Sequence, residues 1–276
     1  MREVTPALID ELTGLVSRAA AAILAARAGA LAPRSKTDGS PVTAADEAAE
    51  AVILDGLERV LPGVPVVSEE AGAPPDLTGD AFVLVDPLDG TRELLAGSDE
   101  FCINLAVVRD SRAQIGIMSS PTAALVWRTA AGGGAERLRL VPGAPAGTAA
   151  ECRRIAPRPW PATGALAAVS RSHLDAQTKA FLAKLSRVTP VATGSALKLC
   201  RVAQGEADVY PRLSPVNQWD VAAGDAIVTA AGGIVTTPAG APLAYGAGTF
   251  LMPGFIAWGD PAAPEWLGFP NLRAKA

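Results

Sequence analysis

The sequence contains few cysteines, and their positions suit neither disulfide bonds nor zinc. Among 276 residues there are three, Cys102, Cys152 and Cys200, and they are scattered without the spacing of a disulfide or metal-binding motif. An excess of basic residues is also lacking, because the formal net charge is -4 and the isoelectric point is near 5.2. The chain has no basic footprint for DNA or RNA, so we expect no nucleic-acid partner.

Long apolar runs are absent as well. Hydrophobic residues make up 49% of the chain, but much of that excess is alanine. The run Ala19–Ala26 is closed by arginine at both ends, whereas a membrane-spanning helix needs about 20 apolar residues. The first residues include Glu3, Asp10 and Glu11 in place of the basic and apolar parts of a signal peptide. We expect a cytoplasmic protein without a transmembrane segment; peripheral attachment to the inner membrane face, and the choice between monomer and homodimer, stay open.

Regular segments alternate with turn-rich linkers along the chain. A chain of this length can form one large or two medium domains. We expect an amphipathic helix near the N-terminus, a strand meander over 103–130, and alternating strands and helices in the C-terminal half. Glycines at 132–134 and a Pro/Gly-rich segment at 141–145 favour a boundary. The predicted division is an N-terminal α+β domain, 1–141, and a C-terminal α/β domain, 142–276.

The segment Asp86–Thr91, with the sequence Asp-Pro-Leu-Asp-Gly-Thr, is the strongest functional signal. The apolar run Phe82–Val85 before it predicts a buried strand that ends at Asp86. Pro87 fixes its own backbone angle and restricts the residue before it, so the chain bends at the strand end. This bend allows the carboxylates of Asp86 and Asp89 to converge on one point.

The other residues of this segment add donors for a metal and an anion. Leu88 offers its carbonyl oxygen, and hard oxygen donors of this kind suit Mg²⁺. Gly90 allows close backbone approach to an anion, and Thr91 supplies a hydroxyl. The alternative is an Asp-Gly turn with proline at its corner, but such a turn needs only one aspartate.

Two more acidic segments strengthen the metal-site interpretation. A short strand is expected over 64–68, and it places Glu69 and Glu70 at its end. Much later, Asp220 opens a helix expected over 220–230. Asp220 is explained either as an ordinary N-cap or as a rigidly held metal ligand from a distant part of the chain.

Together with Lys36–Thr43 and Trp219–Gly224, these motifs resemble the inositol-monophosphatase-like superfamily of Mg²⁺-dependent, Li⁺-sensitive phosphomonoesterases. The resemblance covers nearly the whole chain and implies an α/β fold, a layered αβαβα sandwich. It implies two or three Mg²⁺ ions per site, with Mn²⁺ able to substitute and Li⁺ inhibitory. The metal ligands carried over from the family are Glu69, Asp86, Asp89, Asp220 and the carbonyl of Leu88.

The expected chemistry explains these residue types. Two metal ions bind the attacking and leaving oxygens of an in-line displacement and lower the pKa of a bound water. Positioning and charge neutralisation dominate phosphoryl transfer, so neither a nucleophilic side chain nor a histidine base is needed. The single histidine of the chain agrees with this chemistry.

Asp46 has two compatible interpretations. Thr43 and Asp46 match a capping box at the start of a helix, which is a sufficient structural explanation. In the resembled family, the matching aspartate pairs with the threonine of Asp-Gly-Thr to orient and deprotonate the nucleophilic water. The resemblance therefore assigns Asp46 and Thr91 as the catalytic, water-activating pair.

Finer motifs resemble the bisphosphate-nucleotidase branch of the superfamily. They are Thr91–Glu93, Val169–His173, Gly194–Lys198 and Tyr210–Arg212. A hydroxyl and backbone amides before a helix, a lysine one turn on and an arginine fork suit a phosphate, although each residue also has an ordinary structural role. The substrate contacts implied are Glu69, Leu88, Asp89, Gly90, Thr91, His173, Ser195, Lys198, Arg212 and Asp220.

The predicted function is Mg²⁺-dependent hydrolysis of adenosine 3',5'-bisphosphate, and of its sulfated form as a possible further substrate, to release phosphate. The nucleotide bisphosphate is then the small-molecule partner. The alternative is an inositol-monophosphatase or another sugar-phosphate phosphatase with the same metal site. A non-catalytic sensor on the same scaffold is a third hypothesis, but a pure binder has no need of Asp46 and Thr91.

Overall fold

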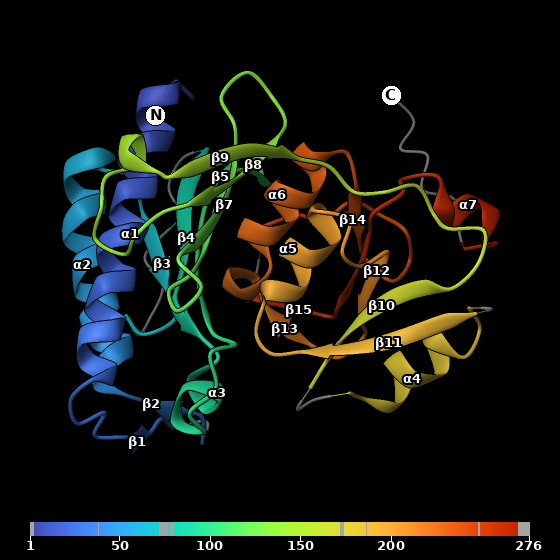
Figure 1. Ribbon diagram of the computed structural model, residues 1–276, viewed down its shortest axis with the longest axis horizontal. Coiled ribbons are helices and arrows are strands. Elements are labelled where there is room, and N and C mark those ends of the chain that lie inside the picture. Colours follow the sequence, from blue (N-terminus) through green and yellow to red (C-terminus); the bar gives the residue numbers. More distant parts are fainter. Residues whose placement is uncertain are drawn as a thin grey trace.

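Helices and sheets alternate in five layers (Figure 1). The structure is a computed structural model that describes residues 3–37, 39–71, 77, 80–171, 174–185, 187–247 and 249–269. From one side to the other, the layers are α1 with α2, a seven-stranded sheet, α5 with α6, a five-stranded sheet, and α4 with α7. The helix bounds are α1 Pro6–Arg27, α2 Ala44–Val60, α3 Thr91–Leu95, α4 Ala176–Leu182, α5 Leu197–Ala203, α6 Ala222–Ala231 and α7 Ala263–Trp266. The αβαβα sandwich implied by the sequence is confirmed.

The first layer forms from two capped, alanine-rich helices. Thr5 caps α1 by accepting the Leu8 amide at 3.2 Å. Thr43 and Asp46 form a complete capping box at the start of α2. The apolar faces of both helices pack on one side of the seven-stranded sheet. The cap at Thr43 thereby fixes where the Asp46 carboxylate stands.

The seven-stranded sheet has the order β3-β4-β5-β6-β7-β8-β9. β3 pairs with β4 in parallel, and the later pairs are antiparallel. Val83 and Val85 of β4 face α1 and α2, whereas Phe82 and Leu84 face α5 and α6. Both faces are buried, which explains the continuous apolar run. The bounds are β3 Val66–Ser68, β4 Ala81–Asp89, β5 Cys102–Arg109, β6 Arg112–Ser120, β7 Leu125–Thr129, β8 Ala135–Arg139 and β9 Glu151–Ile155.

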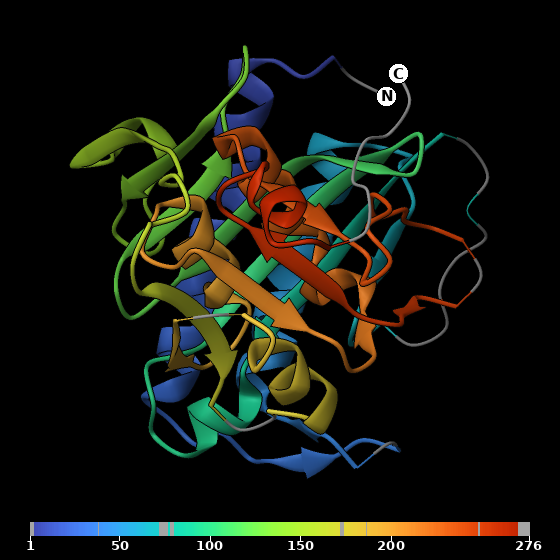
Figure 2. The same ribbon diagram turned by 90° about the vertical axis from the view of Figure 1, so that its right-hand side faces the viewer.

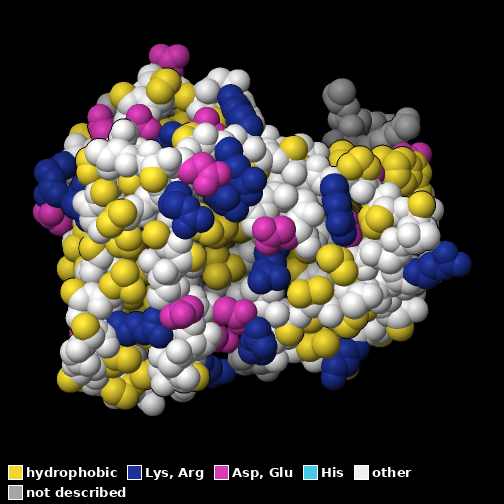
Figure 3. Space-filling view, in the orientation of Figure 1, with side chains coloured by type: hydrophobic (Ala, Val, Ile, Leu, Met, Phe, Trp, Pro, Cys, Tyr) yellow, Lys and Arg dark blue, Asp and Glu magenta, His cyan; other side chains and the backbone are white. Residues whose placement is uncertain are grey.

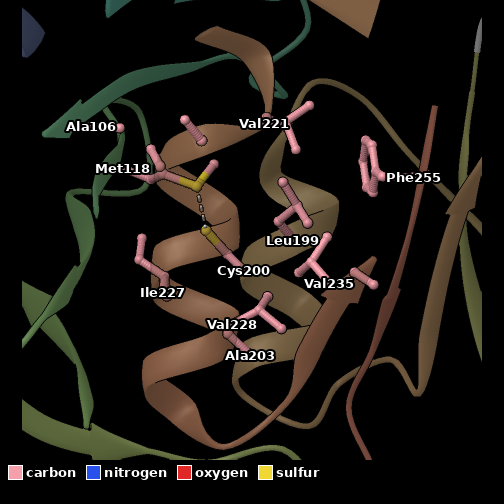
Figure 4. Close-up of a cluster of buried hydrophobic side chains, with 14 of the residues drawn as sticks. Ala106, Met118, Leu199, Cys200, Ala203, Val221, Ile227, Val228, Val235 and Phe255 are labelled. Atoms are coloured by element: carbon pink, nitrogen blue, oxygen red, sulfur yellow. Dashed lines mark hydrogen bonds between the residues drawn. The ribbon is translucent and has the colours of Figure 1, made fainter. Parts of the chain in front are cut away.

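The central helices α5 and α6 lie between the two sheets. Leu199 and Cys200 of α5, with Ile227 and Val228 of α6, pack in one buried cluster, and the Cys200 thiol lies 3.5 Å from the Met118 sulfur (Figure 4). This apolar packing holds the segments before both helices, 193–196 and 218–221, against the N-terminal sheet.

The second sheet has the order β11-β10-β12-β16-β14, and Figure 2 shows it from outside with its outer helices. β10 runs parallel to β11 and β12, whereas β16 is antiparallel to β12 and β14. Its bounds are β10 Ala165–Ser170, β11 Val188–Thr193, β12 Val209–Arg212, β14 Ile234–Thr236 and β16 Phe255–Trp258. Two small pairs, β1 Arg34–Ser35 with β2 Pro41–Val42 and β13 Val216–Asn217 with β15 Leu251–Met252, complete the strands of the described residues.

The seven-stranded sheet continues past the expected boundary at residue 141. β8 forms between the two turn-rich segments, and β9 pairs with it, so the change from one sheet to the other falls between Ile155 and Ala165. The division into two domains at 141 and 142 stays a prediction. No helix in the described ranges combines the length and the apolar character needed to cross a membrane.

Candidate active site

Three carboxylates from distant parts of the chain meet beside the end of β4. Glu69 directly follows β3, and its amide donates to the Val85 carbonyl at 3.1 Å, next to Asp86. Asp220 comes from the other half, in a 3-10 turn, Gln218–Asp220, before α6. Among the described residues, Glu69, Asp86 and Asp220 form a group in which one carboxylate oxygen of each lies within 4.8 Å of one oxygen of the other two.

This group carries more negative charge than its own surroundings neutralise. Oδ2 of Asp86 is buried, and none of the described residues hydrogen-bonds to it. Burial, and then the negative charges of Glu69, Asp89 and Asp220, raise the pKa of Asp86 well above its ordinary value. Burial and the charges of Asp89 and Glu69 raise the pKa of Asp220 in the same way. A divalent cation with oxygen ligands would remove both the repulsion and the unsatisfied acceptor, so these residues fit a metal.

Asp89 and Leu88 stand beside the three-carboxylate group. The strand pairing of β4 shifts between Asp86 and Asp89, and the Leu88 amide donates to Asp86 Oδ1 at 3.0 Å. Oδ2 of Asp89 accepts the Ala196 amide from the C-terminal half. β4 therefore does not end at Asp86 as expected but continues to Asp89 through an irregularity in its pairing, and Asp89 bonds across the cleft and is not part of the group of three.

Asp220 differs from its expected position in the helix. It lies at the end of the 3-10 turn, and Val221 is the residue that caps α6, so Asp220 is not the N-cap. The physical reason is that the turn uses up residues 218–220 before the α-helical pattern begins. The carboxylate of Asp220 is consequently left to face Asp86 and Glu69.

Lys36 is a site residue to which the sequence motifs assigned no role. Its ammonium group forms ion pairs with Glu69 at 2.7 Å and Glu70 at 2.5 Å. Burial lowers the pKa of Lys36, but these hydrogen bonds outweigh it and raise the pKa above its ordinary value. Burial raises the pKa of Glu70 to about 7 despite the partly compensating Lys36. The only sequence signal was the position of Lys36 at the start of the Lys36–Thr43 motif.

Asp46 serves both of its expected partners at once. Its Oδ2 accepts the Thr43 amide at 2.8 Å and the Thr43 hydroxyl at 2.6 Å, which completes the cap. Its Oδ1 accepts the Thr91 hydroxyl at 2.9 Å, and the Leu88 carbonyl lies 3.3 Å from the same hydroxyl. The capping box therefore holds the carboxylate so that its second oxygen is directed at Thr91.

Most of the predicted substrate contacts line one cavity of about 280 Å³. Lys198 is buried, donates to the carbonyls of Thr193 at 3.2 Å and of Ser195, and lies 5.2 Å from the centre of the Tyr210 ring. Nε of Arg212 is buried without a hydrogen-bond partner among the described residues. The predicted residues along the wall are Glu69, Leu88, Asp89, Gly90, Thr91, Ser195, Lys198, Arg212 and Asp220.

Two details of the substrate wall differ from expectation or lie outside the structure's description. α5 begins at Leu197 after Ala196, so Ser195 stands before the cap in the left-handed region, at φ 52°. His173 lies outside the described residues. Ser170, three residues before it, does line the cavity.

The site thus combines two motif aspartates, a glutamate that follows the neighbouring strand, and a distant aspartate beside a Thr–Asp pair. The model of the inositol monophosphatase family matches residues 6–263. The chain belongs to this family. Proteins of this family depend on a metal and have a layered α/β architecture. The acidic group of this structure agrees with the first property, and its five layers agree with the second.

Several relatives that this chain matches over most of its length are 3'(2'),5'-bisphosphate nucleotidases named CysQ. The 3'(2'),5'-bisphosphate nucleotidase CysQ of Escherichia coli O157:H7 is 38% identical over 258 residues, which are 90% of this chain and 98% of that protein. CysQ of Salmonella typhimurium is 35% identical over 256 residues with the same coverage of both chains.

Solved structures of the family are similar to this chain in fold. The crystal structure of CysQ from Bacteroides thetaiotaomicron is similar with a TM-score of 0.78 and 30% identity, covering 92% of this chain and 97% of that one. An inositol monophosphatase from Anabaena gives a TM-score of 0.74 and 25% identity, over 95% and 94% of the two chains.

Proposed function

We propose that this protein is a Mg²⁺-dependent 3'(2'),5'-bisphosphate nucleotidase that converts adenosine 3',5'-bisphosphate to AMP and phosphate. The similarity to CysQ nucleotidases over nearly the whole length supports the activity. The observation that carries the proposal is one cavity lined both by the carboxylates of Glu69, Asp89 and Asp220 and by the two cations Lys198 and Arg212. The carboxylates suit a metal at the phosphate that is cleaved, and the cations suit a second phosphate.

The metal would be held by Glu69, Asp86 and Asp220, with Asp89 and the Leu88 carbonyl as further ligands. When bound, Mg²⁺ supplies activation of water and neutralisation of charge on the phosphoryl oxygens. Carboxylate oxygens are hard ligands, so we expect the site to bind Mg²⁺ and to accept Mn²⁺ as a substitute.

Thr91 and Asp46 would orient and deprotonate the attacking water. The Thr91 hydroxyl donates to Asp46 Oδ1 at 2.9 Å, so its oxygen keeps a lone pair with which it accepts a hydrogen bond from water. Proton transfer from water to Thr91 Oγ1 is then coupled to transfer from Thr91 to Asp46. The second carboxylate oxygen of Asp46 stays bound to Thr43, which keeps the acceptor in place.

Arg212 is the best candidate for the grip on the phosphate that is not cleaved. Burial lowers the pKa of Arg212, but neighbours including Tyr210 and Asp220 raise it above its ordinary value, so the side chain stays charged. No described residue accepts a hydrogen bond from its buried Nε, whereas Lys198 already donates to two carbonyl groups. Ser195 lines the same wall.

A phosphate-release panel tests the function. Purified protein is assayed with adenosine 3',5'-bisphosphate, its sulfated form and inositol 1-phosphate at equal concentration, in Mg²⁺, in Mn²⁺, in Mg²⁺ with Li⁺, and in excess EDTA. We expect the highest kcat/KM with the bisphosphate, inhibition by Li⁺, and no turnover in EDTA. Preference for inositol phosphate would make the protein an inositol monophosphatase instead, and full activity in EDTA would exclude the metal mechanism.

A variant of Arg212 tests the substrate class more finely. Arg212→Ala should lower kcat/KM for the bisphosphate by about ten- to a hundredfold, because a charge-assisted contact is lost, and should change the rate on a monophosphate little. Arg201→Ala is the matched control, because Arg201, which lies on α5, lines a different cavity. Equal losses on both substrates would assign Arg212 to structural support.

We propose that the protein acts in the cytoplasm.

A further inference from the structure

One carboxylate from the N-terminal half holds the ends of two strands of the C-terminal sheet. β10 and β11 run parallel, and their last residues, Ser170 and Thr193, are partners in register. The next residues along each strand are Arg171 and Gly194. Both are bound by Glu100, which lies in the loop between α3 and β5.

The contacts of Glu100 are charge-assisted and well formed. Nε and Nη2 of Arg171 donate to its two oxygens at 3.0 and 2.9 Å, and the Gly194 amide donates to Oε2 at 2.8 Å. Paired bonds of this geometry are among the strongest hydrogen bonds in proteins. The bonds from Arg171, with help from the Gly194 amide, hold the pKa of Glu100 below its ordinary value although partial burial acts against them. Acidic and basic side chains also gather along the middle of one face, between the two halves (Figure 3).

The backbone of Glu100 fits between two glycines of the site. A Cβ at Gly194 would lie 2.8 Å from the Cβ of Glu100, and a Cβ at Gly90 would lie 3.1 Å from its carbonyl oxygen. Gly90, at φ 105°, belongs to the Asp-Pro-Leu-Asp-Gly-Thr segment, and Gly194 begins the loop before α5. Glu100 therefore separates the metal-binding segment and the substrate loop by a fixed distance.

The loop 194–196 needs such an external support. Ser195 occupies the left-handed region, which is unfavourable for a residue with a side chain. The other charged groups that hold the loop are Asp89, which accepts the Ala196 amide, and Lys198, which donates to the Ser195 carbonyl. Both belong to the cavity wall, whereas Glu100 does not line the cavity.

We infer that Glu100 is a positioning residue that fixes the loop 194–196 and the end of β10 against the metal-binding segment, and so sets where the substrate's phosphates bind. This inference rests on the proposed function, because that function places the phosphates in this cavity. Glu100 acts through Gly194 and Arg171 and does not touch the substrate itself.

Steady-state kinetics of Glu100→Ala and Glu100→Gln test the inference. We expect Glu100→Ala to raise KM by about tenfold or more while kcat changes by less than about threefold, because binding geometry is lost and the water-activating pair is retained. Glu100→Gln keeps an oxygen acceptor for the Gly194 amide, so it should recover part of the lost affinity. Asp99→Asn is the matched control, because this neighbour pairs with Arg27 at 2.7 Å and should keep the wild-type KM.

Mg²⁺ binding without substrate, measured by calorimetry, separates positioning from metal ligation. We expect unchanged Mg²⁺ affinity in both Glu100 variants. An unchanged KM in Glu100→Ala, or a loss of kcat alone, would overturn the inference, and so would equal effects of Asp99→Asn. If Glu100→Ala does not fold, the KM values of Glu100→Gln and Arg171→Met test the inference instead. We expect both variants to raise KM, by less than the increase expected for Glu100→Ala.

The comparison uses whichever ester of the panel the wild-type protein hydrolyses fastest. If that ester is not a nucleotide bisphosphate, the proposed substrate is wrong, while the KM comparison still decides the role of Glu100. If the bisphosphate is hydrolysed and the Glu100 variants behave like wild type, the positioning role alone is wrong.

Discussion

Replacing Asp86 with asparagine should stabilise the metal-free protein and reduce its stabilisation by Mg²⁺. One oxygen from each of Glu69, Asp86 and Asp220 lies within 4.8 Å of the other two. Asparagine keeps the Oδ1 that accepts the Leu88 amide and places an NH₂ group where Oδ2 has no hydrogen-bond partner among the described residues. The change removes repulsion and adds a donor, at the cost of one of the proposed metal ligands.

The size of the effect follows from Coulomb's law. Two unit charges 4.8 Å apart repel by about 3.5 kcal/mol at an effective dielectric constant of about 20, and by about 0.9 kcal/mol in water. Asp86 takes part in two such pairs, but the raised pKa values of Asp86 and Asp220 mean that part of the charge is lost to protonation. We therefore expect a gain of about 1–3 kcal/mol without metal, or about 2–10 °C in Tm.

Thermal unfolding in EDTA and in Mg²⁺ measures both effects. At about 100 times its Kd, Mg²⁺ should stabilise the wild-type protein by about 2.7 kcal/mol, and the Asp86→Asn variant by clearly less. The order of the two Tm values should thus invert between the two conditions. Asp55→Asn, on an exposed pair with Arg59 on α2, is the control and should leave both Tm values nearly unchanged. An equal loss of Tm with and without Mg²⁺ would refute the reasoning.

Three further predictions concern the same site. Thr91→Ala should lower kcat by about a hundredfold or more and leave Mg²⁺ affinity near that of wild type, and Thr91→Ser should restore much of the rate; an effect on KM alone would contradict water activation. Lys36→Met should tighten Mg²⁺ binding measured by calorimetry, because an ammonium group 2.7 Å from Glu69 competes with the metal; weaker binding would contradict competition. Burial raises the pKa of Glu70 from 4.5 to about 7. A group that binds its proton more tightly in the folded state stabilises the fold most at a pH below its unfolded pKa. The metal-free protein should therefore lose stability as the pH rises from about 4.5 to about 7. Burial shifts the pKa of Asp86 in the same direction, so the Tm advantage of Asp86→Asn should grow as the pH rises above the ordinary pKa of an aspartate; a constant advantage would disagree with this titration.

Local patterns predicted most of the elements that carry the site. The apolar run before Asp86 became the centre of β4, and its continuous hydrophobicity is explained by helices on both faces of the sheet. The capping box at Thr43 and Asp46 is present with both of its hydrogen bonds. These features depend on neighbours within a few residues, so short sequence windows contain the necessary information.

Other expectations were modified by contacts that no local pattern contains. β8 and β9 extend the first sheet through the region expected to be a boundary, because their pairing satisfies backbone groups that a linker would expose. The sequence position of Lys198 is compatible with a solvated helix face, but Lys198 is buried and donates to the carbonyls of Thr193, at the end of β11, and of Ser195. Lys36, between β1 and β2, pairs with Glu69 although 33 positions separate the two residues, and no local pattern contains that contact.

The sequence by itself determined the chemical identity of the site. Carboxylates, a threonine and a glycine at fixed spacing after an apolar run specify a bent strand end with hard oxygen donors, because backbone restriction by proline and glycine is local. Only the tertiary structure decided how the distant groups combine. Asp220 joins Asp86 across 134 positions, Asp89 binds the Ala196 amide, and Glu100 binds Gly194, since these distances follow from the packing of α5 and α6 between two sheets. Burial in that interface also creates the unsatisfied charge, which no residue spacing expresses.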